Sequence, residues 1–284
     1  AYAIEGDTGK LRRLNQQSAR GTASCYLEVD ASGKCVLVAN YSSGTVAALP
    51  VLEDGSLGPA TSFVQHSKWG DDSQRQKGPN AHCFVVSPDN RFAFAADLGI
   101  NKILNYRLDA ATAQLTENEA QPWIKLPPGS GPRHLTFHPN GQRVYAINEL
   151  NNTITVFNYA SDSGTLTQQQ NISTVPEDFS GKSFTADLKI TPNGKFLYGT
   201  NRGHDSIAIF RIADDGQLQR VGIEPSLGKG PQNLLITPDG RWLLCANMPS
   251  NNLAVFAIDA NTGALQAAAE PISIPMPACI RWLE

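Results

Sequence analysis

Short apolar runs separated by polar turns recur along the whole chain. In a typical unit an alternating segment leads into a Pro-Asn/Asp-Gly-Arg/Lys turn, and a second apolar run then ends at an Asn or Asp. The five copies of the turn and second run cover residues 31–40, 88–97, 139–148, 192–201 and 238–247, and the first lacks the proline. Runs this short, bounded by turn residues and without a helical period, predict the strands of β-hairpins.

Each hairpin is followed by a third apolar run, such as 153–157 or 206–210, and by a turn that ends in leucine, such as Asp215-Gly-Gln-Leu218. A weaker fourth run closes the unit. The closing residues recur at intervals of 46 to 57 positions, at Asn40, Asp97, Asn148, Asn201 and Asn247. This period is typical of propeller repeats, and four antiparallel strands per repeat predict a propeller blade.

The two ends of the chain look like partial repeats. Residues 2–11 match a third strand with its turn, and residues 277–283 match the first strand of a blade. If the two ends build one blade together, the ring has six blades; the alternative is a larger ring whose N-terminal strands are missing. We therefore expect residues 1–284 to form a single all-β propeller domain that is incomplete at its N-terminus.

Composition excludes several classes of function. The net charge of −3 lacks the positive excess of a nucleic-acid-binding protein. The chain contains no apolar run of about 18 residues, which is the length that would predict a membrane span. The cysteines lack the CxxC spacing of structural zinc sites, so we interpret them as buried, reduced thiols of a cytoplasmic protein: Cys25, Cys35, Cys83, Cys245 and Cys279.

Polar residues that fail to repeat point to a site. When the repeats are aligned on the turn proline, the position six residues before it holds Cys25, His82, Arg133, Ala186 and Gln232, and the next position holds Tyr26, Cys83, His134, Asp187 and Asn233. The residue after the closing Asn or Asp is Tyr41, Leu98, Glu149, Arg202 or Met248. The first two of these positions open the innermost strand of a blade, beside the central channel. The unusual polar members fall in consecutive repeats: His82, Arg133, His134, Glu149, Asp187, Arg202 and His204.

This set has the residue types of an acid–base site for an anionic substrate. Carboxylates and imidazoles exchange protons near neutral pH, and arginines bind carboxylate or phosphate groups. The alternative is structural, because Asp187 or His204 could simply join loops by hydrogen bonds. We expect His138 to be a turn residue and the repeated Asn and Asp residues to be scaffold.

Two polar loops, 65–80 and 174–183, lead directly into innermost strands. We expect them to border the channel mouth and to gate it, with an ordinary solvated loop as the alternative in each case.

Several motifs together resemble a known family: His66, Arg75-Gln-x-x-Pro-x-Ala-His82, Gly131-Pro-Arg-His134, Asn148-Glu149, Ser173-Thr-Val-Pro176 and Asn201-Arg-Gly-His-Asp-Ser-Ile207. They are similar to the lactonase family of seven-bladed β-propellers, which includes propeller-type 6-phosphogluconolactonases and carboxy-cis,cis-muconate cyclases. The resemblance implies seven blades and a channel site that uses no metal or other cofactor. The chain departs from the pattern at Gln232, where the family often has arginine, and at Lys189, a position frequently held by histidine.

The expected function is hydrolysis of a sugar-acid lactone, first of all 6-phosphogluconolactone. Arg133 and Arg202 would hold an anionic group and polarise the carbonyl, and His134 or Glu149 would activate water. His82 or His204 would protonate the leaving oxygen, and Asp187, Gln232 and Asn233 would complete the substrate-binding set. Two alternatives stay open: a cycloisomerase that closes a carboxymuconate without adding water, and a non-catalytic binding propeller, which would have no polar cluster converging on the channel.

Overall fold

The computed structural model of this protein describes residues 1–67 and 75–283. The chain divides into two compact units, one formed by residues 1–131 with 161–165 and the other by residues 132–160 with 166–284. Each unit is described by itself below. The assignment of one domain to the whole chain stays a prediction.

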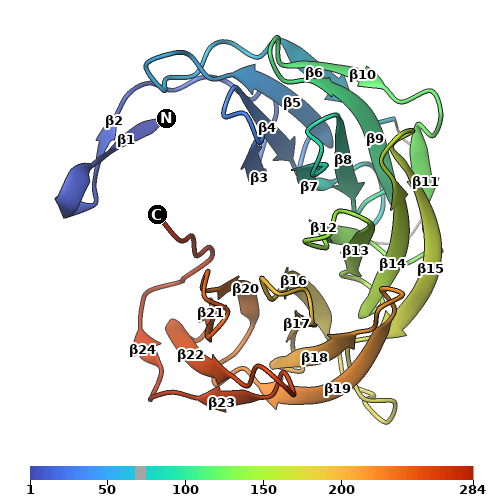
Figure 1. Cartoon of the computed structure of the whole chain (residues 1–284), viewed down its shortest axis with the longest axis vertical. Coiled ribbons are helices and arrows are strands. Elements are labelled where there is room, and N and C mark those ends of the chain that lie inside the picture. The colour runs from blue at the N-terminus through green and yellow to red at the C-terminus, as the bar shows by residue number, and fades with distance from the viewer. Residues whose placement is uncertain (68–74, 284) are drawn as a thin grey trace. The chain divides into compact units, whose positions relative to one another are not determined.

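The first unit contains a two-stranded hairpin and two larger antiparallel sheets (Figure 1). The hairpin pairs β1 (Tyr2–Glu5) with β2 (Lys10–Arg13) around the short 3₁₀ turn Gly6–Thr8. The next sheet consists of β3 (Ser24–Val29), β4 (Cys35–Asn40), β5 (Thr45–Pro50) and β6 (Ser62–Gln65). The last consists of β7 (Ala81–Val86), β8 (Phe92–Asp97), β9 (Lys102–Asp109) and β10 (Gln114–Glu117), with β11 (Trp123–Lys125) also paired to β9.

The second unit contains three sheets with the same strand order. The first consists of β12 (Pro132–Phe137), β13 (Arg143–Asn148), β14 (Thr153–Ala160) and β15 (Thr165–Ser173). The second consists of β16 (Phe184–Ile190), β17 (Phe196–Arg202), β18 (Ser206–Ile212) and β19 (Leu218–Pro225). The third consists of β20 (Pro231–Ile236), β21 (Trp242–Asn247), β22 (Asn252–Ile258) and β23 (Leu265–Ala267), with β24 (Ile272–Ser273) also paired to β22. The predicted four-stranded antiparallel repeat is confirmed.

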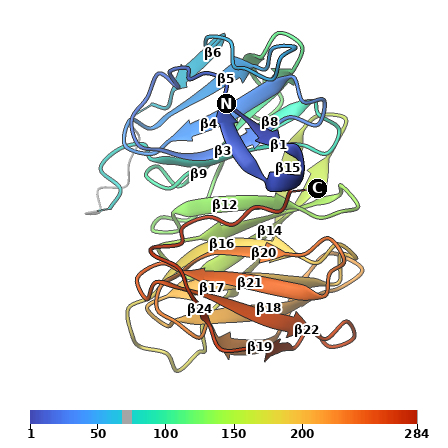
Figure 2. The same cartoon turned by 90° about the vertical axis from the view of Figure 1, so that its left-hand side faces the viewer.

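The sheets of the second unit meet through their first strands. Strand β16 contacts both β12 and β20, and β16 and β20 lie side by side in both views (Figures 1 and 2). Apolar side chains from facing sheets form the core between them, for example the buried cluster Tyr145, Ile147, Ile154, Val156, Leu188, Leu197 and Phe210. Polar residues on the first strands therefore come from neighbouring sheets onto one side of the unit.

The repeated Asn residues are scaffold, as the sequence predicts. Each is fully buried, and its side-chain amide donates a hydrogen bond to the side chain five residues later: Asn40 to Thr45, Asn148 to Thr153, Asn201 to Ser206 and Asn247 to Asn252, at 2.9 to 3.1 Å. The turn glycines adopt positive φ, for example +73° at Gly194, which explains glycine at that position. His138 accepts a hydrogen bond from the Asn140 amide and is a turn residue, as expected.

Every first strand carries a β-bulge at the position six residues before the turn proline. The pairing with the second strand skips Cys25 in β3, His82 in β7, Arg133 in β12 and Gln232 in β20, and it is interrupted at Ala186 and Asp187 in β16. A bulge places two residues opposite one and redirects their side chains. The position that varies in the alignment of the repeats is thus one where the side chain does not follow the regular alternation between the two faces of the sheet.

Two expectations were wrong. Residues 277–283 do not form a strand, because the segment pairs with no strand in the described parts of the chain; the backbone amide of Ile280 is instead bonded to the Asn233 side chain. All five cysteines are free, but Cys25 and Cys279 are exposed rather than buried. The cytoplasmic location that was inferred partly from them stays a prediction.

Candidate active site in the second unit

The first strands and their hairpin partners bring five predicted residues together in the second unit. Arg133 and His134 lie on β12 at and just after its bulge, and Asp187 lies at the bulge of β16. Glu149 directly follows β13, and Arg202 is the last residue of β17. Their side chains form two linked groups, one around Glu149 and one around Asp187.

Glu149 lies between two arginines. Its Oε2 atom is 2.9 Å from Arg133 Nε and 2.8 Å from Arg202 Nη2. Arg133 and Glu149 are buried, whereas the Arg202 side chain is 25 % exposed. One negative charge shared by two guanidinium groups leaves this group with a net positive charge, which favours an anionic ligand.

Backbone oxygens fix both guanidinium groups. Arg133 Nη1 donates to the Ala186 carbonyl oxygen on the neighbouring sheet. Arg202 Nη2 donates to the Thr185 carbonyl oxygen at 2.9 Å, and its Nη1 lies 3.4 Å from Gln232 Oε1. Arg202 therefore has a fixed orientation and a solvent-facing side, and Gln232 is placed next to it.

His134 is oriented by Asp187. His134 Nδ1 lies 2.8 Å from Asp187 Oδ1, and its Nε2 lies 3.4 Å from Arg133 Nη1. A carboxylate is only an acceptor, so Nδ1 carries the proton and Nε2 carries the lone pair of the neutral ring. The imidazole side chain is 12 % exposed, so it has limited access to solvent.

Four donors surround the buried carboxylate of Asp187. In addition to His134, it accepts hydrogen bonds from Lys189 Nζ at 2.8 and 2.9 Å, from Asn233 Nδ2 at 2.6 Å and from the Leu234 backbone amide at 3.0 Å. The other amide atom of Asn233, Oδ1, accepts from the Ile280 amide. Asn233 is thus placed where it supports Asp187.

These contacts shift the pKa values of both members of the pair. The pKa of His134 is lowered to about 4, mainly by burial and then by the charge of Arg133, while the hydrogen bond to Asp187 acts in the opposite direction. Burial opposes ionisation of Asp187, but Lys189 and His134 outweigh it and hold the pKa of the Asp187 carboxyl well below its usual range. The pair is therefore a neutral imidazole beside an ionised carboxylate at neutral pH.

The His204 side chain contacts Ser206 and Phe179 rather than the residues of this network. His204 Nδ1 lies 2.6 Å from Ser206 Oγ, and the ring packs edge-on against Phe179, with ring centroids 4.7 Å apart. Phe179 belongs to the 174–183 loop, so that loop is anchored to the turn after β17. A gating role for the loop stays a prediction.

His82 belongs to the first unit. It lies at the bulge of β7, is 9 % exposed, and contacts the Cys25 sulfur at 3.8 Å and the edge of the Tyr41 ring. That His82 acts in catalysis together with the residues of the second unit stays a prediction.

Comparison with known proteins identifies the family. A family model described as lactonase, 7-bladed beta-propeller, matches residues 1–282. The chain belongs to this family. Its sheets are therefore blades of the family's propeller, and the resemblance seen in the sequence motifs is confirmed.

Relatives of this lactonase-family chain include named lactonases. A 6-phosphogluconolactonase of Bacillus subtilis is 35 % identical over 284 residues, which are 100 % of this chain and 80 % of the relative. The crystal structure of a putative 6-phosphogluconolactonase from Bacteroides fragilis is 33 % identical, with a TM-score of 0.92, and is covered to 79 % by the whole chain. The periplasmic gluconolactonase of Pseudomonas aeruginosa is 32 % identical, with a TM-score of 0.92 over 99 % of this chain and 78 % of that one. An uncharacterized Lactococcus lactis protein is 32 % identical.

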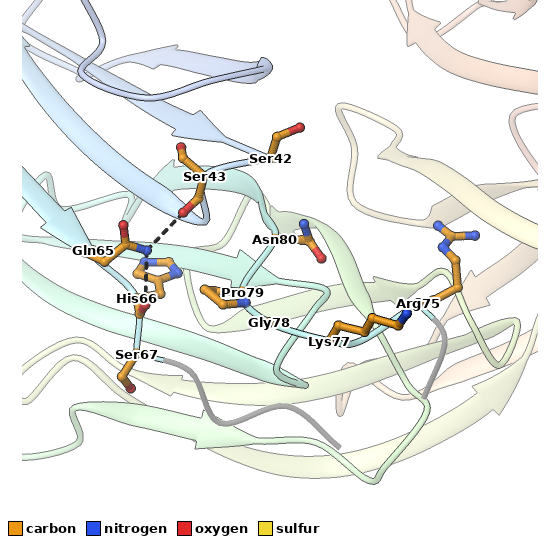
Figure 3. Close-up of a pocket in the computed structure, with 10 residues that line it drawn as sticks. All are labelled: Ser42, Ser43, Gln65, His66, Ser67, Arg75, Lys77, Gly78, Pro79 and Asn80. Atoms are coloured by element: carbon orange, nitrogen blue, oxygen red, sulfur yellow. Dashed lines mark hydrogen bonds between the residues drawn. The ribbon is translucent and has the colours of Figure 1, made fainter. Parts of the chain in front are cut away.

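The first unit of this lactonase-family chain holds a polar pocket, shown in Figure 3. It is lined by Ser42, Ser43, Gln65, His66, Ser67, Arg75, Lys77, Gly78, Pro79 and Asn80. The predicted 65–80 loop forms much of its wall, but residues 68–74 of that loop lie outside the described residues. Hydroxyl, amide and cationic groups suit a polar or anionic ligand.

Within the described residues, no group of three or more His, Cys, Asp or Glu side chains is arranged to hold a metal ion. The same residues contain no helix that is long and apolar enough to cross a membrane.

The alignment of repeats located most of the network but missed Lys189. That residue attracted notice only because the family often has histidine there. The sequence could have indicated Lys189 by its position two residues after Asp187 on the same strand, because residues two apart on a strand point to the same face.

Proposed function

We propose that this chain hydrolyses the ester bond of a sugar-acid lactone, with 6-phosphogluconolactone as the first candidate substrate. The observation that carries the proposal is a neutral, carboxylate-oriented imidazole next to a cationic group that contains Arg133, Glu149 and Arg202. An acid–base residue beside anion-binding arginines is what opening of an anionic lactone requires. Lactonases among the relatives support the same reaction class.

His134 is better suited than Glu149 to act as the general base. Protonation of Glu149 would weaken its ion pairs with Arg133 and Arg202, which lie 2.9 and 2.8 Å from its Oε2. His134 instead presents a basic nitrogen and has Asp187 on its other side to stabilise the imidazolium that forms.

The reaction consumes one water molecule, and His134 is neutral again at its end. His134 Nε2 takes a proton from water as its oxygen bonds to the lactone carbonyl carbon, and Arg202 stabilises the negative charge that develops on the carbonyl oxygen. The bond from that carbon to the ring oxygen then breaks, and the imidazolium returns its proton to the leaving oxygen. The product is the open-chain hydroxy acid, which ionises in solution.

The test is a panel of lactones assayed by pH-stat at constant pH. 6-Phosphogluconolactone, gluconolactone and a muconolactone are compared for wild type, His134→Gln and His138→Gln. Hydrolysis of a sugar-acid lactone by wild type and His138→Gln, with strong loss in His134→Gln, supports the proposal. No hydrolysis above the spontaneous rate would overturn it, and conversion of the muconolactone into an unsaturated acid of unchanged mass, with no water added, would favour the cycloisomerase instead.

A further inference from the structure

Lys189 is the cationic partner of the buried Asp187 carboxylate. It lies on β16, two residues after Asp187, and its Nζ donates to Asp187 Oδ1 at 2.9 Å and to Oδ2 at 2.8 Å. Its side chain is 29 % exposed, whereas that of Asp187 is 1 % exposed. The ammonium group therefore links the buried carboxylate to the solvent side of the unit.

Lys189 carries a positive charge, unlike the neutral donors Asn233 and the Leu234 amide around Asp187. Asn233 and the Leu234 amide supply hydrogen bonds without a full charge. A buried carboxylate is costly unless a positive charge compensates it. Without Lys189, the group best placed to supply that charge is His134, which would have to become an imidazolium.

Lys189 and His134 also compete for the same oxygen. Lys189 Nζ and His134 Nδ1 both contact Asp187 Oδ1, at 2.9 and 2.8 Å. A cation at that oxygen repels a second positive charge on the imidazole.

We propose that Lys189 is a positioning residue for His134: its ammonium group neutralises Asp187, so that the carboxylate orients the imidazole through Nδ1 without drawing a second proton onto Nε2. The inference rests on the proposed role of His134 as the general base. It assigns Lys189 no contact with the substrate.

The charged groups around His134 in the second unit define what the substitution of Lys189 changes. Arg133 is its neighbour on β12, Glu149 after β13 pairs with Arg133, and Arg202 on β17 pairs with Glu149. Strand β16 contributes only Asp187 and Lys189 to this set. Loss of the lysine charge removes one of the two cations near the imidazole and leaves Arg133 as the other, so protonation of His134 becomes easier.

The test compares Lys189→Met, Lys189→Gln and Lys189→Arg with wild type. The His134 imidazole is titrated by NMR, and the same proteins are assayed for lactone hydrolysis across pH. We expect the methionine and glutamine variants to raise the His134 titration midpoint by about one pH unit or more, because a nearby charge shifts a pKa on that scale. The acidic limb of the rate profile should move by the same amount, and Lys189→Arg should restore the wild-type midpoint.

The two uncharged variants separate charge from hydrogen bonding and from folding. Glutamine retains a donor, so a shift in Lys189→Gln assigns the effect to the lost charge. If Lys189→Met does not fold, the glutamine variant still tests the proposal. An unchanged His134 titration in a folded, uncharged variant would overturn it.

Failure of the proposed function gives a different result. If no lactone is hydrolysed, the NMR titration still shows whether Lys189 controls the protonation of His134. If lactones are hydrolysed and the titration does not move, only the role of Lys189 is rejected.

Discussion

Two histidine–aspartate pairs, one in each unit, have nearly the same bond and different surroundings. In the first unit His66 Nδ1 lies 2.6 Å from Asp97 Oδ2, and in the second His134 Nδ1 lies 2.8 Å from Asp187 Oδ1. The bond alone therefore does not distinguish a structural pair from a chemical one. The difference lies in what each pair contacts beyond that bond.

Both members of the His66–Asp97 pair have further hydrogen-bond partners within the first unit. Tyr106 OH lies 3.2 Å from His66 Nε2, and Asp97 Oδ1 accepts the backbone amides of Asn80 and Gly99. Both side chains of the pair are fully buried. The pair joins the segment before β7 to the end of β8, as the bond from Thr174 Oγ1 to Asn201 Oδ1 joins the segment before β16 to β17, so we interpret it as a cross-link of the scaffold.

The His134–Asp187 pair has charged groups on both sides. Arg133 lies beside His134 Nε2, and Lys189 holds Asp187. The arginine belongs in turn to the Glu149 group. An imidazole that is oriented at one nitrogen and lies next to a cation at the other has the arrangement of a base for an anionic substrate.

The largest expected effect is on catalysis by the second pair. His134→Gln should lower kcat for lactone hydrolysis by about a thousandfold, since a general base contributes roughly 10² to 10⁴ in rate. His66→Gln, measured on protein that remains folded, should change kcat by only a few-fold. Equal loss of activity in the two variants would remove the distinction between the pairs.

Glu149→Gln should have the next largest effect. Loss of the carboxylate charge leaves two fixed arginines without their shared partner, and we expect kcat/KM to fall by about a hundredfold. Glu270→Gln, an exposed substitution in the same unit, is the matched control. Steady-state kinetics that show no difference between these variants would contradict a role for the Glu149 group.

A substitution in the first pair should lower the stability of the folded protein strongly. His66→Gln removes one partner from a fully buried pair, and such losses cost about 3–5 kcal/mol of the free energy of unfolding. Chemical unfolding should show this loss, whereas Glu270→Gln at an exposed position should change little. Wild-type stability in His66→Gln would show that the pair is not a structural cross-link.

The second pair should make stability depend on pH. The pKa of His134 is lowered to about 4 in the folded protein, below its unfolded value of about 6.5, so the unfolded chain binds more protons between these values. The contribution of His134 to the free energy of unfolding is therefore fully present above about pH 6.5. It is lost as the pH drops towards 4, by about 3 kcal/mol at most. Urea unfolding at a series of pH values should show this loss in wild type and a flatter dependence in His134→Gln. An equal slope in both proteins would contradict the assigned neutral imidazole.

Local patterns were enough to predict the strands, their turns and the scaffold role of the repeated Asn residues. These features depend on neighbours a few residues apart, as the bond from Asn201 to Ser206 shows. Alignment of the repeats also found the variable positions of Arg133, His134 and Asp187. It could not show that those positions lie at bulges, because a bulge depends on the register with the partner strand.

By itself, the sequence determined a repeated four-stranded unit and the places where the repeats differ in chemistry, because strand alternation and turn geometry are local properties. Only the tertiary structure decided that Asp187 bonds His134 on the neighbouring sheet, that Glu149 joins two arginines, and that His204 contacts Ser206 and Phe179 instead. It also showed that Lys189 holds the same carboxylate as His134. The physical reason is that these charges interact across sheets, where packing and burial, rather than distance along the chain, decide which groups meet.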